Sequence, residues 1–307
     1  MRAAVIQAKN AIPKITDFEE PQASPGNLLI DVSAGAIGPT DLMRAAGFFG
    51  PVNGPYVIAG EGVGRLQDGS PVYFGHSVPP FGGWGERTLV PEAEVWPMPE
   101  DLPEERVLAL GISGTGALIP LEEAKIQPGE TVLILGATGP LGQIALQMAR
   151  VLGAGRVIGA ARSIDKLQQL KARGWADAVV QLGGDDDLAA LKAEAGDGYN
   201  VVLDTIYGPP AENAMRATAP GARMMSIGVG AGTRVSLTLG ELVFRSHIGV
   251  GTGQRPVAER RAAFERTMSM AREHNFEVDI LSFGLDEAES AWAAQAGSPH
   301  AKVIVRP

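Results

Sequence analysis

One short stretch of the chain constrains the fold more than any other. Residues 131–135 read TVLIL, an apolar run, and residues 136–142 read GATGPLG, a glycine turn. Beyond the turn, apolar residues recur at helical spacing, at Leu141, Ile144, Ala145, Met148 and Leu152. A strand that passes through glycines directly into a helix predicts the first strand–helix unit of a parallel sheet.

The same alternation continues along the chain. Further strands are expected at 156–161, 178–182, 200–204 and 223–229, with helices near 165–173, 188–194 and 211–218. Strands that alternate with helices predict a parallel sheet with right-handed crossovers, here a doubly wound α/β fold.

The residues on either side of this region show different secondary-structure patterns. The first hundred residues contain short strand-like runs divided by Pro-Gly, Asp-Gly-Ser and Gly-Gly turns, which predict an all-β module. The end of the chain combines helix and strand patterns. Helices are expected there at 257–274 and 287–296, and strands at 276–283 and 301–305.

The glycine turn also predicts a ligand. It matches the G-x-G-x-x-G pattern of dinucleotide-binding sheets, with Ala137 in the place of the first glycine. Gly139 would let the backbone approach a pyrophosphate, and Gly142 would let the helix pack closely on the strand. A purely structural glycine turn is the alternative. The residues expected at the pyrophosphate are Ala137, Gly139, Leu141 and Gly142, and Thr138 and Pro140 of the same turn are expected to contact the cofactor.

The end of the next strand predicts which dinucleotide binds. Arg162 stands about where an acidic residue would read the 2′-hydroxyl of NAD, and Ser163 and Lys166 follow it. Two cationic groups and a hydroxyl favour a 2′-phosphate, and therefore NADP(H). In the alternative, Ser163 caps the next helix, and Arg162 and Lys166 are solvated surface charges. Asp165 lies in the first helical turn, where it complements the helix dipole.

Composition excludes several other classes of protein. A net charge of −9 with no long basic run argues against nucleic-acid binding. The absence of cysteine excludes disulfides, thiolate zinc sites and iron–sulfur clusters, and the four histidines show no metal-binding spacing, so no metal is expected. We find no signal peptide at the N-terminus and no 18-residue apolar stretch, so we expect a cytoplasmic protein without a membrane partner.

The order of these parts resembles the medium-chain dehydrogenase/reductase superfamily, and within it the quinone oxidoreductase and ζ-crystallin group. Similar segments are AIGPTD at 36–41, AGEGVGRL at 59–66, GGWGERTLVP at 82–91, the glycine turn, and APGARMMSIG at 219–228. The resemblance implies a GroES-like β-rich catalytic domain, residues 1–112 and 254–307, and a Rossmann domain, residues 113–253. It also implies a substrate cleft between them.

The departures from the family predict the activity. Zinc alcohol dehydrogenases of the superfamily carry cysteine and histidine ligands where this chain has Gly38 and Gly60. The resemblance therefore implies a zinc-free enzyme that uses NADPH to reduce a quinone or an α,β-unsaturated carbonyl compound. Two rivals stay open: a zinc-free carbonyl or alcohol dehydrogenase, and a non-catalytic NADPH-binding sensor. Gly38, which replaces an asparagine of the quinone reductases, favours the sensor.

The resemblance also implies catalytic candidates. Asp41 matches an aspartate of the family, and Thr115 a threonine beside the nicotinamide. A helix cap or buried ion pair is the alternative for Asp41, and a backbone-bonded helix hydroxyl for Thr115. His76 is a further, weaker candidate for a proton donor.

The far side of the cofactor is expected at the ends of two later strands. The residues expected to contact the nicotinamide are Ile227, Gly228, Val250, Gly251 and Thr252. Residues 247–251 form the expected edge strand, which in similar proteins pairs with a second copy, so a homodimer is predicted.

Overall fold

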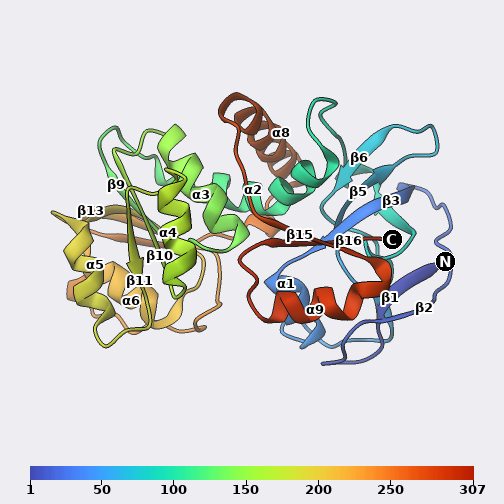
Figure 1. The fold of residues 1–307 in the computed structure, drawn as a ribbon, viewed down its shortest axis with the longest axis horizontal. Helices are drawn as coiled ribbons and strands as arrows, with labels where there is room; N and C mark the ends of the chain where they lie inside the picture. Colours follow the sequence, from blue (N-terminus) through green and yellow to red (C-terminus); the bar gives the residue numbers. More distant parts are fainter. The chain divides into compact units, whose positions relative to one another are not determined.

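The computed structural model describes residues 1–307, which divide into two compact units (Figure 1). The β-rich unit comprises residues 1–112, 257–272 and 278–307. The parallel-sheet unit comprises residues 113–256 and 273–277. Both termini therefore belong to the β-rich unit.

Six parallel strands form the sheet of the parallel-sheet unit, in the order β11-β10-β9-β12-β13-β14. They are β9 (Thr131–Leu135), β10 (Arg156–Ala161), β11 (Ala178–Gln181), β12 (Tyr199–Asp204), β13 (Thr218–Ser226) and β14 (Ser246–Gly249). The helices of this unit are α3 (Pro140–Val151), α4 (Ile164–Ala172), α5 (Asp187–Ala195), α6 (Gly208–Arg216) and α7 (Leu239–Leu242). In chain order the sheet runs 3-2-1-4-5-6, which is the doubly wound order, so the predicted fold of this region is confirmed.

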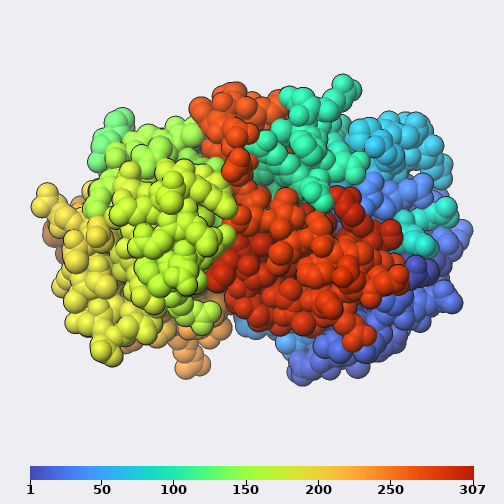
Figure 2. All heavy atoms as spheres, viewed as in Figure 1, coloured from blue at the N-terminus to red at the C-terminus, as the bar shows by residue number.

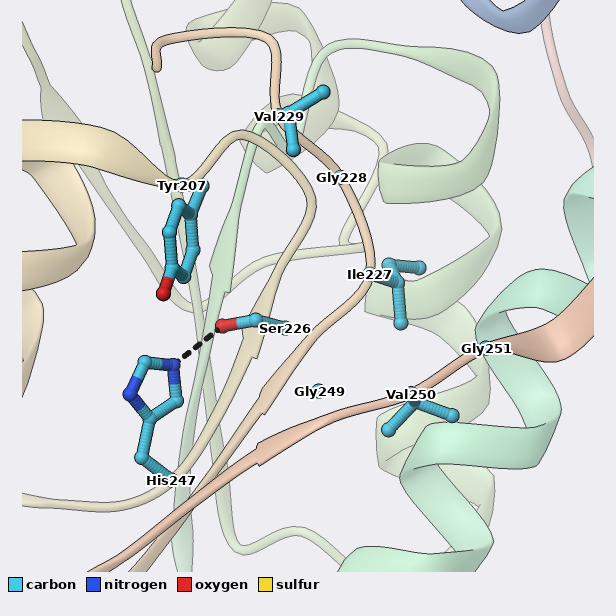
Figure 3. Close-up of a pocket in the computed structure, with 9 residues that line it drawn as sticks. All are labelled: Tyr207, Ser226, Ile227, Gly228, Val229, His247, Gly249, Val250 and Gly251. Atoms are coloured by element: carbon cyan, nitrogen blue, oxygen red, sulfur yellow. Dashed lines mark hydrogen bonds between the residues drawn. The ribbon is translucent and has the colours of Figure 1, made fainter. Parts of the chain in front are cut away.

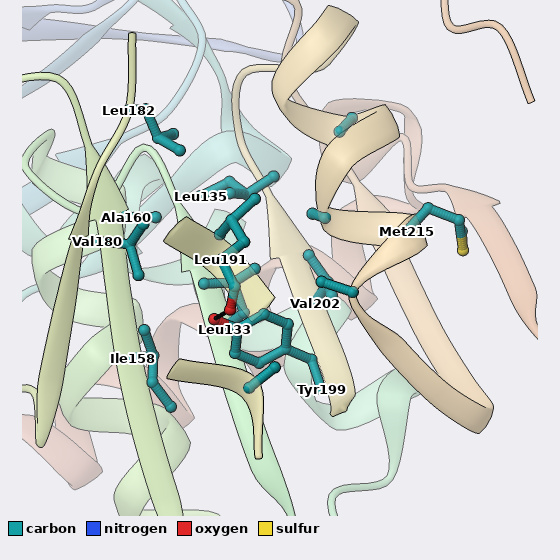
Figure 4. Close-up of a cluster of buried hydrophobic side chains, with 14 of the residues drawn as sticks. Leu133, Leu135, Ile158, Ala160, Val180, Leu182, Leu191, Tyr199, Val202 and Met215 are labelled. Carbon is teal, nitrogen blue, oxygen red and sulfur yellow. Dashed lines mark hydrogen bonds between the residues drawn. The ribbon is translucent and has the colours of Figure 1, made fainter. Parts of the chain in front are cut away.

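The central strands β9, β10 and β12 of this sheet are apolar and mostly buried, as is typical of parallel strands that helices cover. One cluster of buried side chains lies between the sheet and the helices α5 and α6 (Figure 4). Tyr199 is the large polar member of this cluster, and its hydroxyl donates to the Leu191 carbonyl at 2.8 Å. Complete burial of one aliphatic side chain contributes roughly 1.5–3 kcal/mol, so this cluster stabilises the unit strongly.

Two sheets form the β-rich unit. Strands β2-β1-β4 make a three-stranded sheet, and β15-β16-β3-β5-β6-β8, with β7 paired to β3, make a seven-stranded one. The strands are β1 (Arg2–Ile6), β2 (Lys14–Asp17), β3 (Asn27–Ile37), β4 (Tyr56–Val57), β5 (Glu61–Arg65), β6 (Pro71–Phe74), β7 (Arg87–Pro91), β8 (Val95–Pro97), β15 (Ile280–Gly284) and β16 (Lys302–Arg306). The expected helices at the end of the chain are α8 (Val257–His274) and α9 (Ala288–Ala296).

The two ends of the chain lie side by side in this unit. Figure 2 shows the C-terminal segment, in red, beside the N-terminal strands, in blue. Lys14 of β2 forms an ion pair with Glu289 of α9 at 2.7 Å, and Ile6, Trp292 and Val303 share one buried cluster. The last strands therefore complete a core that the first strands begin.

Helix α1 and the start of β15 differ from the sequence prediction. The β module contains a helix, α1 (Pro39–Ala45), which the strand and turn pattern missed. Pro39 is preorganised for the first helical position, and the Asp41 carboxylate accepts the Gly38 N–H at 2.8 Å. The expected strand at 276–283 begins only at Ile280: helix α8 is capped at Asn275, which has a left-handed φ of +51°, and the buried Phe276 lies in the irregular segment that follows.

Helix α2 (Glu104–Ala124) corrects the prediction that no stretch is long and apolar enough to span a membrane. By length and composition α2 meets that requirement, and 72% of its most apolar window is buried inside the protein. Buried core helices meet the same requirement, so this observation is weak support for a membrane span.

Candidate functional site

The glycine turn after β9 is held against the end of β10. Gly136 has a left-handed φ of +78°, which favours glycine, and its N–H donates to the Ala160 carbonyl at 2.9 Å. The Ala137 N–H donates to the same oxygen at 3.1 Å. A Cβ on Gly136 would lie 2.1 Å from Thr205 Oγ1. Gly136 therefore serves the tight turn, one residue before the Ala137 that stands in the place of the first motif glycine.

The other two glycines of the motif differ in the space around them. A Cβ on Gly142 would lie 2.3 Å from the Gly136 carbonyl oxygen, so helix α3 packs directly on the turn. A Cβ on Gly139 would meet only that oxygen, at 3.7 Å, so the space beside Gly139 is open. Helix α3 begins at Pro140, so the N–H groups of Leu141 and Gly142 lie in its first turn and have no intrahelical acceptors, while Pro140 has no N–H to satisfy. This arrangement suits an anion.

Sequence reasoning missed Gln143, which supports the turn from within. Its side chain is fully buried and donates through Nε2 to the Thr138 carbonyl at 2.8 Å. The side chains of Ala137 and Thr138 are also buried, whereas Pro140 and Leu141 are partly exposed. A glutamine among the residues that bury one face of helix α3 was the available signal.

The residues predicted to bind the 2′-phosphate lie at the carboxyl end of β10. Arg162 follows the strand directly, is exposed and forms no ion pair. Ser163 is the N-cap residue of α4, as in the structural alternative, yet its side chain makes no capping hydrogen bond. Lys166 is half-buried in the first turn of α4. Binding of a phosphate by these residues stays a prediction.

A pocket of about 480 Å³ opens at the carboxyl ends of β12, β13 and β14 (Figure 3). Its lining residues are Tyr207, Ser226, Ile227, Gly228, Val229, His247, Gly249, Val250 and Gly251. Four of the five residues expected at the nicotinamide are among them, and Thr252 instead begins a short 3₁₀ turn, Thr252–Gln254. A Cβ on Gly228 would lie 1.9 Å from the Thr205 carbonyl oxygen, so the loop after β12 and the end of β13 meet closely.

Two of the pocket's lining residues, Ser226 and His247, belong to a polar chain that the sequence did not predict. The Ser226 hydroxyl donates to Asp204 Oδ2 at 2.7 Å and lies 3.0 Å from His247 Nε2. Asp204 is fully buried, and this burial raises the pKa of its carboxyl group. Asp204 and Ser226 each end a strand, which was the signal that could have identified them.

Thr115 lies in the part of α2 that belongs to the parallel-sheet unit. A Cβ on its neighbour Gly116 would lie 2.9 Å from Leu141 Cδ1, so this turn of α2 lies against the start of α3. Thr115 is partly exposed there. The small residue at Gly116 permits this close approach, and the role of Thr115 stays a prediction.

Asp41 makes the contact of a helix cap, which the sequence analysis left open as the alternative to a catalytic role. Its carboxylate accepts the Gly38 N–H at the start of α1, and burial raises its pKa. A Cβ on Gly38 would meet no atom within 4 Å, so the place of the family asparagine is open.

The most buried charges of the β-rich unit lie near Asp41. Glu61 Oε2 pairs with Lys302 Nζ at 2.5 Å, and Glu61 Oε1 accepts from the Tyr73 hydroxyl at 2.8 Å and the Ile112 N–H at 2.7 Å. Burial raises the pKa of Tyr73 well above its usual range, and the adjacent Glu61 adds to the effect. Sequence reasoning missed this cluster.

The remaining candidate, His76, is held by charged neighbours. It lies 3.7 Å from the Glu94 carboxylate and 3.3 Å from Arg260, and burial lowers its pKa. No group of three or more histidine, aspartate or glutamate side chains in residues 1–307 is arranged to hold a metal ion.

Comparison with known proteins agrees with this geometry. The family model described as zinc-binding dehydrogenase matches residues 140–268. The chain is 29% identical over 248 residues to quinone oxidoreductase-like protein 2 of Bos taurus, covering 78% of this chain and 70% of that protein. It is 30% identical over 221 residues to prostaglandin reductase-3 of Mus musculus, covering 69% of this chain but only 58% of that protein.

A solved structure extends the likeness to the whole chain. The quinone oxidoreductase of Thermus thermophilus, whose structure is also known in complex with NADPH, is 27% identical. The two structures superimpose with a TM-score of 0.83, and the match covers 100% of both chains. The predicted fold class, a GroES-like β-rich domain with a Rossmann domain, is confirmed.

Proposed function

Because the chain belongs to the medium-chain dehydrogenase/reductase superfamily, in its quinone oxidoreductase-like group, we propose that it is a zinc-free, NADPH-dependent reductase of quinones or α,β-unsaturated carbonyl compounds. The observation that carries the proposal is the open backbone at Gly139, beside the strand end that carries Arg162. The bound dinucleotide would supply the hydride, and the residues below would hold it.

The pyrophosphate is proposed to lie over the start of α3. Gly139 leaves room for it, and the N–H groups of Leu141 and Gly142 point outward from a helix terminus that carries partial positive charge. Ala137 and Thr138 would shape the turn rather than touch the phosphates, because their side chains are buried and the Ala137 N–H already bonds to Ala160.

The 2′-phosphate is proposed to bind Arg162, Ser163 and Lys166. Arg162 is exposed without an ion-pair partner, which leaves its guanidinium available, and the Ser163 hydroxyl is not used as a cap. In a chain of net charge −9, this local positive charge is what would attract a dianionic group.

Arg162→Ala tests this choice of cofactor. We expect NADPH binding to weaken by about 1–3 kcal/mol while NADH binding is nearly unchanged, because only NADPH carries the group that Arg162 contacts. Lys171→Ala, at the far end of the same helix, removes an equal charge and is the control. Equal losses for NADPH and NADH, measured by calorimetry, would contradict the assignment.

The nicotinamide is proposed to lie in the pocket at the ends of β13 and β14. Ile227 and Val250 offer apolar contacts, Gly228 and Gly251 permit close approach, and Thr252 follows on the adjoining turn. Thr115 is the candidate hydrogen-bonding group for the carboxamide or a substrate carbonyl, since its turn of α2 lies against the start of α3. Asp41 is the candidate polar group contributed by α1.

Zinc independence rests on the side chains at the family's ligand positions. Gly38 and Gly60 carry no ligand atoms, and the chain has no cysteine. Reduction of a quinone or an activated C=C bond needs hydride, positioning and a proton source, whereas alcohol oxidation by this superfamily uses the metal as a Lewis acid.

We further propose a cytoplasmic homodimer built on the exposed edge strand β14. Large apolar side chains on and beside this edge are exposed: Leu239 80%, Val243 43%, Phe244 81% and Ile248 43%. An uncovered edge with such side chains favours pairing with a second copy. Sedimentation of the protein and of Ile248→Lys, which should dissociate the pair, tests this proposal.

The deciding experiment is an oxidation assay with NADPH and NADH, in the presence of a metal chelator. The acceptors are 9,10-phenanthrenequinone, 1,4-benzoquinone, a simple enone and a simple ketone. Turnover of the quinones or the enone with NADPH preferred supports the proposal, and turnover of the ketone alone would replace it with a carbonyl reductase. Binding of NADPH without turnover of any acceptor would favour a sensor, which the missing side chain at Gly38 also favours.

A further inference from the structure

A chain of three polar side chains crosses the carboxyl ends of β12, β13 and β14. The Ser226 hydroxyl stands in the middle, 2.7 Å from Asp204 Oδ2 and 3.0 Å from His247 Nε2 (Figure 3). In hydrolytic triads the histidine stands between the other two residues, so this order does not activate the serine as a nucleophile. The chain has a different consequence, which follows from the direction of its hydrogen bonds.

Asp204 fixes that direction in its ionised form, because a carboxylate can only accept hydrogen bonds, and the hydrogen bonds from Tyr207, Ser226 and Ile206 oppose the effect of burial and favour that form. Its Oδ1 accepts the N–H groups of Ile206 at 3.0 Å and Tyr207 at 2.8 Å, and its Oδ2 accepts the Ser226 hydroxyl. A hydroxyl has a single proton, so Ser226 has none left for His247. The contact between Ser226 and His247 must therefore run from Nε2–H to the serine oxygen.

Neutral His247 accordingly carries its proton on Nε2 and leaves Nδ1 as an acceptor. Burial lowers the pKa of His247, which favours the neutral ring at pH 7. The ring is also held in place from the side, because Tyr207 packs against it with ring centroids 5.8 Å apart. Tyr207 has a left-handed φ of +58°, and the Asp204 carboxylate holds its N–H in that conformation.

The surrounding pocket has one apolar and one polar side. Figure 3 shows Ile227 and Val250 pointing to one side of the strand ends, and Ser226 and His247 pointing to the other. His247 Nδ1 has no hydrogen-bond partner within the protein. A flat ligand lying across the glycines between these sides would have its ring on apolar groups and a polar substituent near the histidine.

We propose that Asp204, acting through Ser226, is a positioning residue that fixes the Nε2–H tautomer of His247 and so presents Nδ1 to a hydroxyl or amide N–H donor of the bound ligand. The identity of the ligand rests on the proposed function, whereas the tautomer does not. The carboxamide of a nicotinamide and the hydroxyl of a hydroquinone both supply such a donor, and the tests below separate them.

The tautomer is measured in the free protein by ¹⁵N NMR of histidine-labelled samples, because protonated and bare ring nitrogens resonate far apart. His247→Gln assigns the signal among the four histidines. The wild type should carry its proton on Nε2. In Asp204→Asn the amide can donate to Ser226, whose hydroxyl then donates to Nε2, so the proton should move to Nδ1. A wild-type proton on Nδ1, or an unchanged tautomer in the variant, would overturn the inference.

Ser226→Ala keeps the inference testable if Asp204→Asn does not fold. This substitution removes the only acceptor of the Nε2–H group while leaving the two backbone hydrogen bonds of Asp204 in place. We expect His247 to become a mixture of tautomers. A tautomer as uniform as that of the wild type would show that Ser226 does not direct the proton.

The ligand is identified by three additions to the labelled wild type: NADP⁺, 2′-phospho-ADP-ribose, which lacks the nicotinamide, and a hydroquinone. A shift of the Nδ1 signal with NADP⁺ but not with 2′-phospho-ADP-ribose assigns the donor to the carboxamide. A shift with the hydroquinone alone assigns it to the substrate. In His247→Phe, whose ring has no acceptor, the assigned ligand should bind roughly fivefold to tenfold more weakly.

The failures of the two proposals are distinguishable. If calorimetry shows NADP⁺ binding but no addition moves the Nδ1 signal, the ligand half of this inference is wrong and the proposed function stands. If NADP⁺ does not bind, the proposed function fails together with the ligand half, and the tautomer in the free protein still decides the role of Asp204.

Discussion

The two units use their polar groups differently. The parallel-sheet unit presents backbone N–H groups at its glycine turn, whereas the β-rich unit buries charged side chains in an ion pair. The turn presents backbone N–H groups at Leu141 and Gly142, and its glycines give the space for them. The β-rich unit instead buries the side-chain charges of Glu61 and Lys302, 4% and 5% exposed. A backbone site depends on local steric fit, whereas a buried ion pair depends on every partner being present.

Lys302→Met should be the most damaging single change, because it leaves the Glu61 carboxylate buried without its countercharge. We expect a loss of about 3–5 kcal/mol in the free energy of unfolding, measured by denaturant titration. The exposed pair of Lys14 and Glu289 is the control, and Lys14→Met should cost at most about 1 kcal/mol.

A double variant then separates charge from packing. In Glu61→Gln with Lys302→Met no unpaired charge remains, so part of the lost stability should return. Equal losses of unfolding free energy in the single and double variants would show that the lysine stabilises the unit through packing alone. The β-rich unit would then not depend on a buried ion pair.

The backbone site is tested by two alanine substitutions that differ only in the space around the new Cβ. Gly142→Ala would place its Cβ 2.3 Å from the Gly136 carbonyl oxygen, and should destabilise the protein by about 1–3 kcal/mol. Gly139→Ala has room, with a φ of −73°, and should leave stability nearly unchanged while it weakens NADPH binding. If Gly139→Ala bound NADPH normally, the pyrophosphate would not approach there.

The same contrast explains what the sequence could predict. The parallel sheet and its turn follow from local periodicity and from glycine spacing within seven residues, 136–142. The pair of Glu61 and Lys302 joins positions 241 residues apart, and no local pattern connects them. Ser226 joins Asp204 and His247 across three strands for the same reason. Helix α1 was missed because one proline and one capping aspartate, rather than an apolar period, define it.

A partly exposed ion pair in the parallel-sheet unit should behave differently from the buried pair. Arg223 of β13 pairs with Glu130, just before β9, at 2.6 Å, and the two side chains are 23% and 16% exposed. The hydrogen bonds from Arg223 lower the pKa of Glu130. The pair therefore stabilises the protein above the ordinary glutamate pKa of about 4.3, and this contribution is lost as the pH falls through the lowered value.

Glu130→Gln measures that contribution. At pH 7 we expect the variant to be less stable by about 1 kcal/mol, a value reduced by solvent screening. The difference should shrink in unfolding experiments below about pH 4, where the wild-type carboxylate becomes protonated. A difference that stayed constant down to about pH 2 would show that charge is not its source.

The smallest change in stability is expected at Gly38, where the β-rich unit has space instead of a side chain. The backbone there is extended, with a φ of −143°, and a Cβ would meet nothing within 4 Å. Gly38→Asn should therefore change the free energy of unfolding by no more than about 0.5 kcal/mol.

If the asparagine of the quinone reductases positions the substrate, the variant should raise kcat/KM for quinones and leave the NADPH affinity unchanged. Gly38→Ala, which adds bulk without a polar group, is the control. An equal rise in both variants would assign the effect to the backbone of α1, and no rise in either would mean that this chain positions its substrate without a side chain at residue 38.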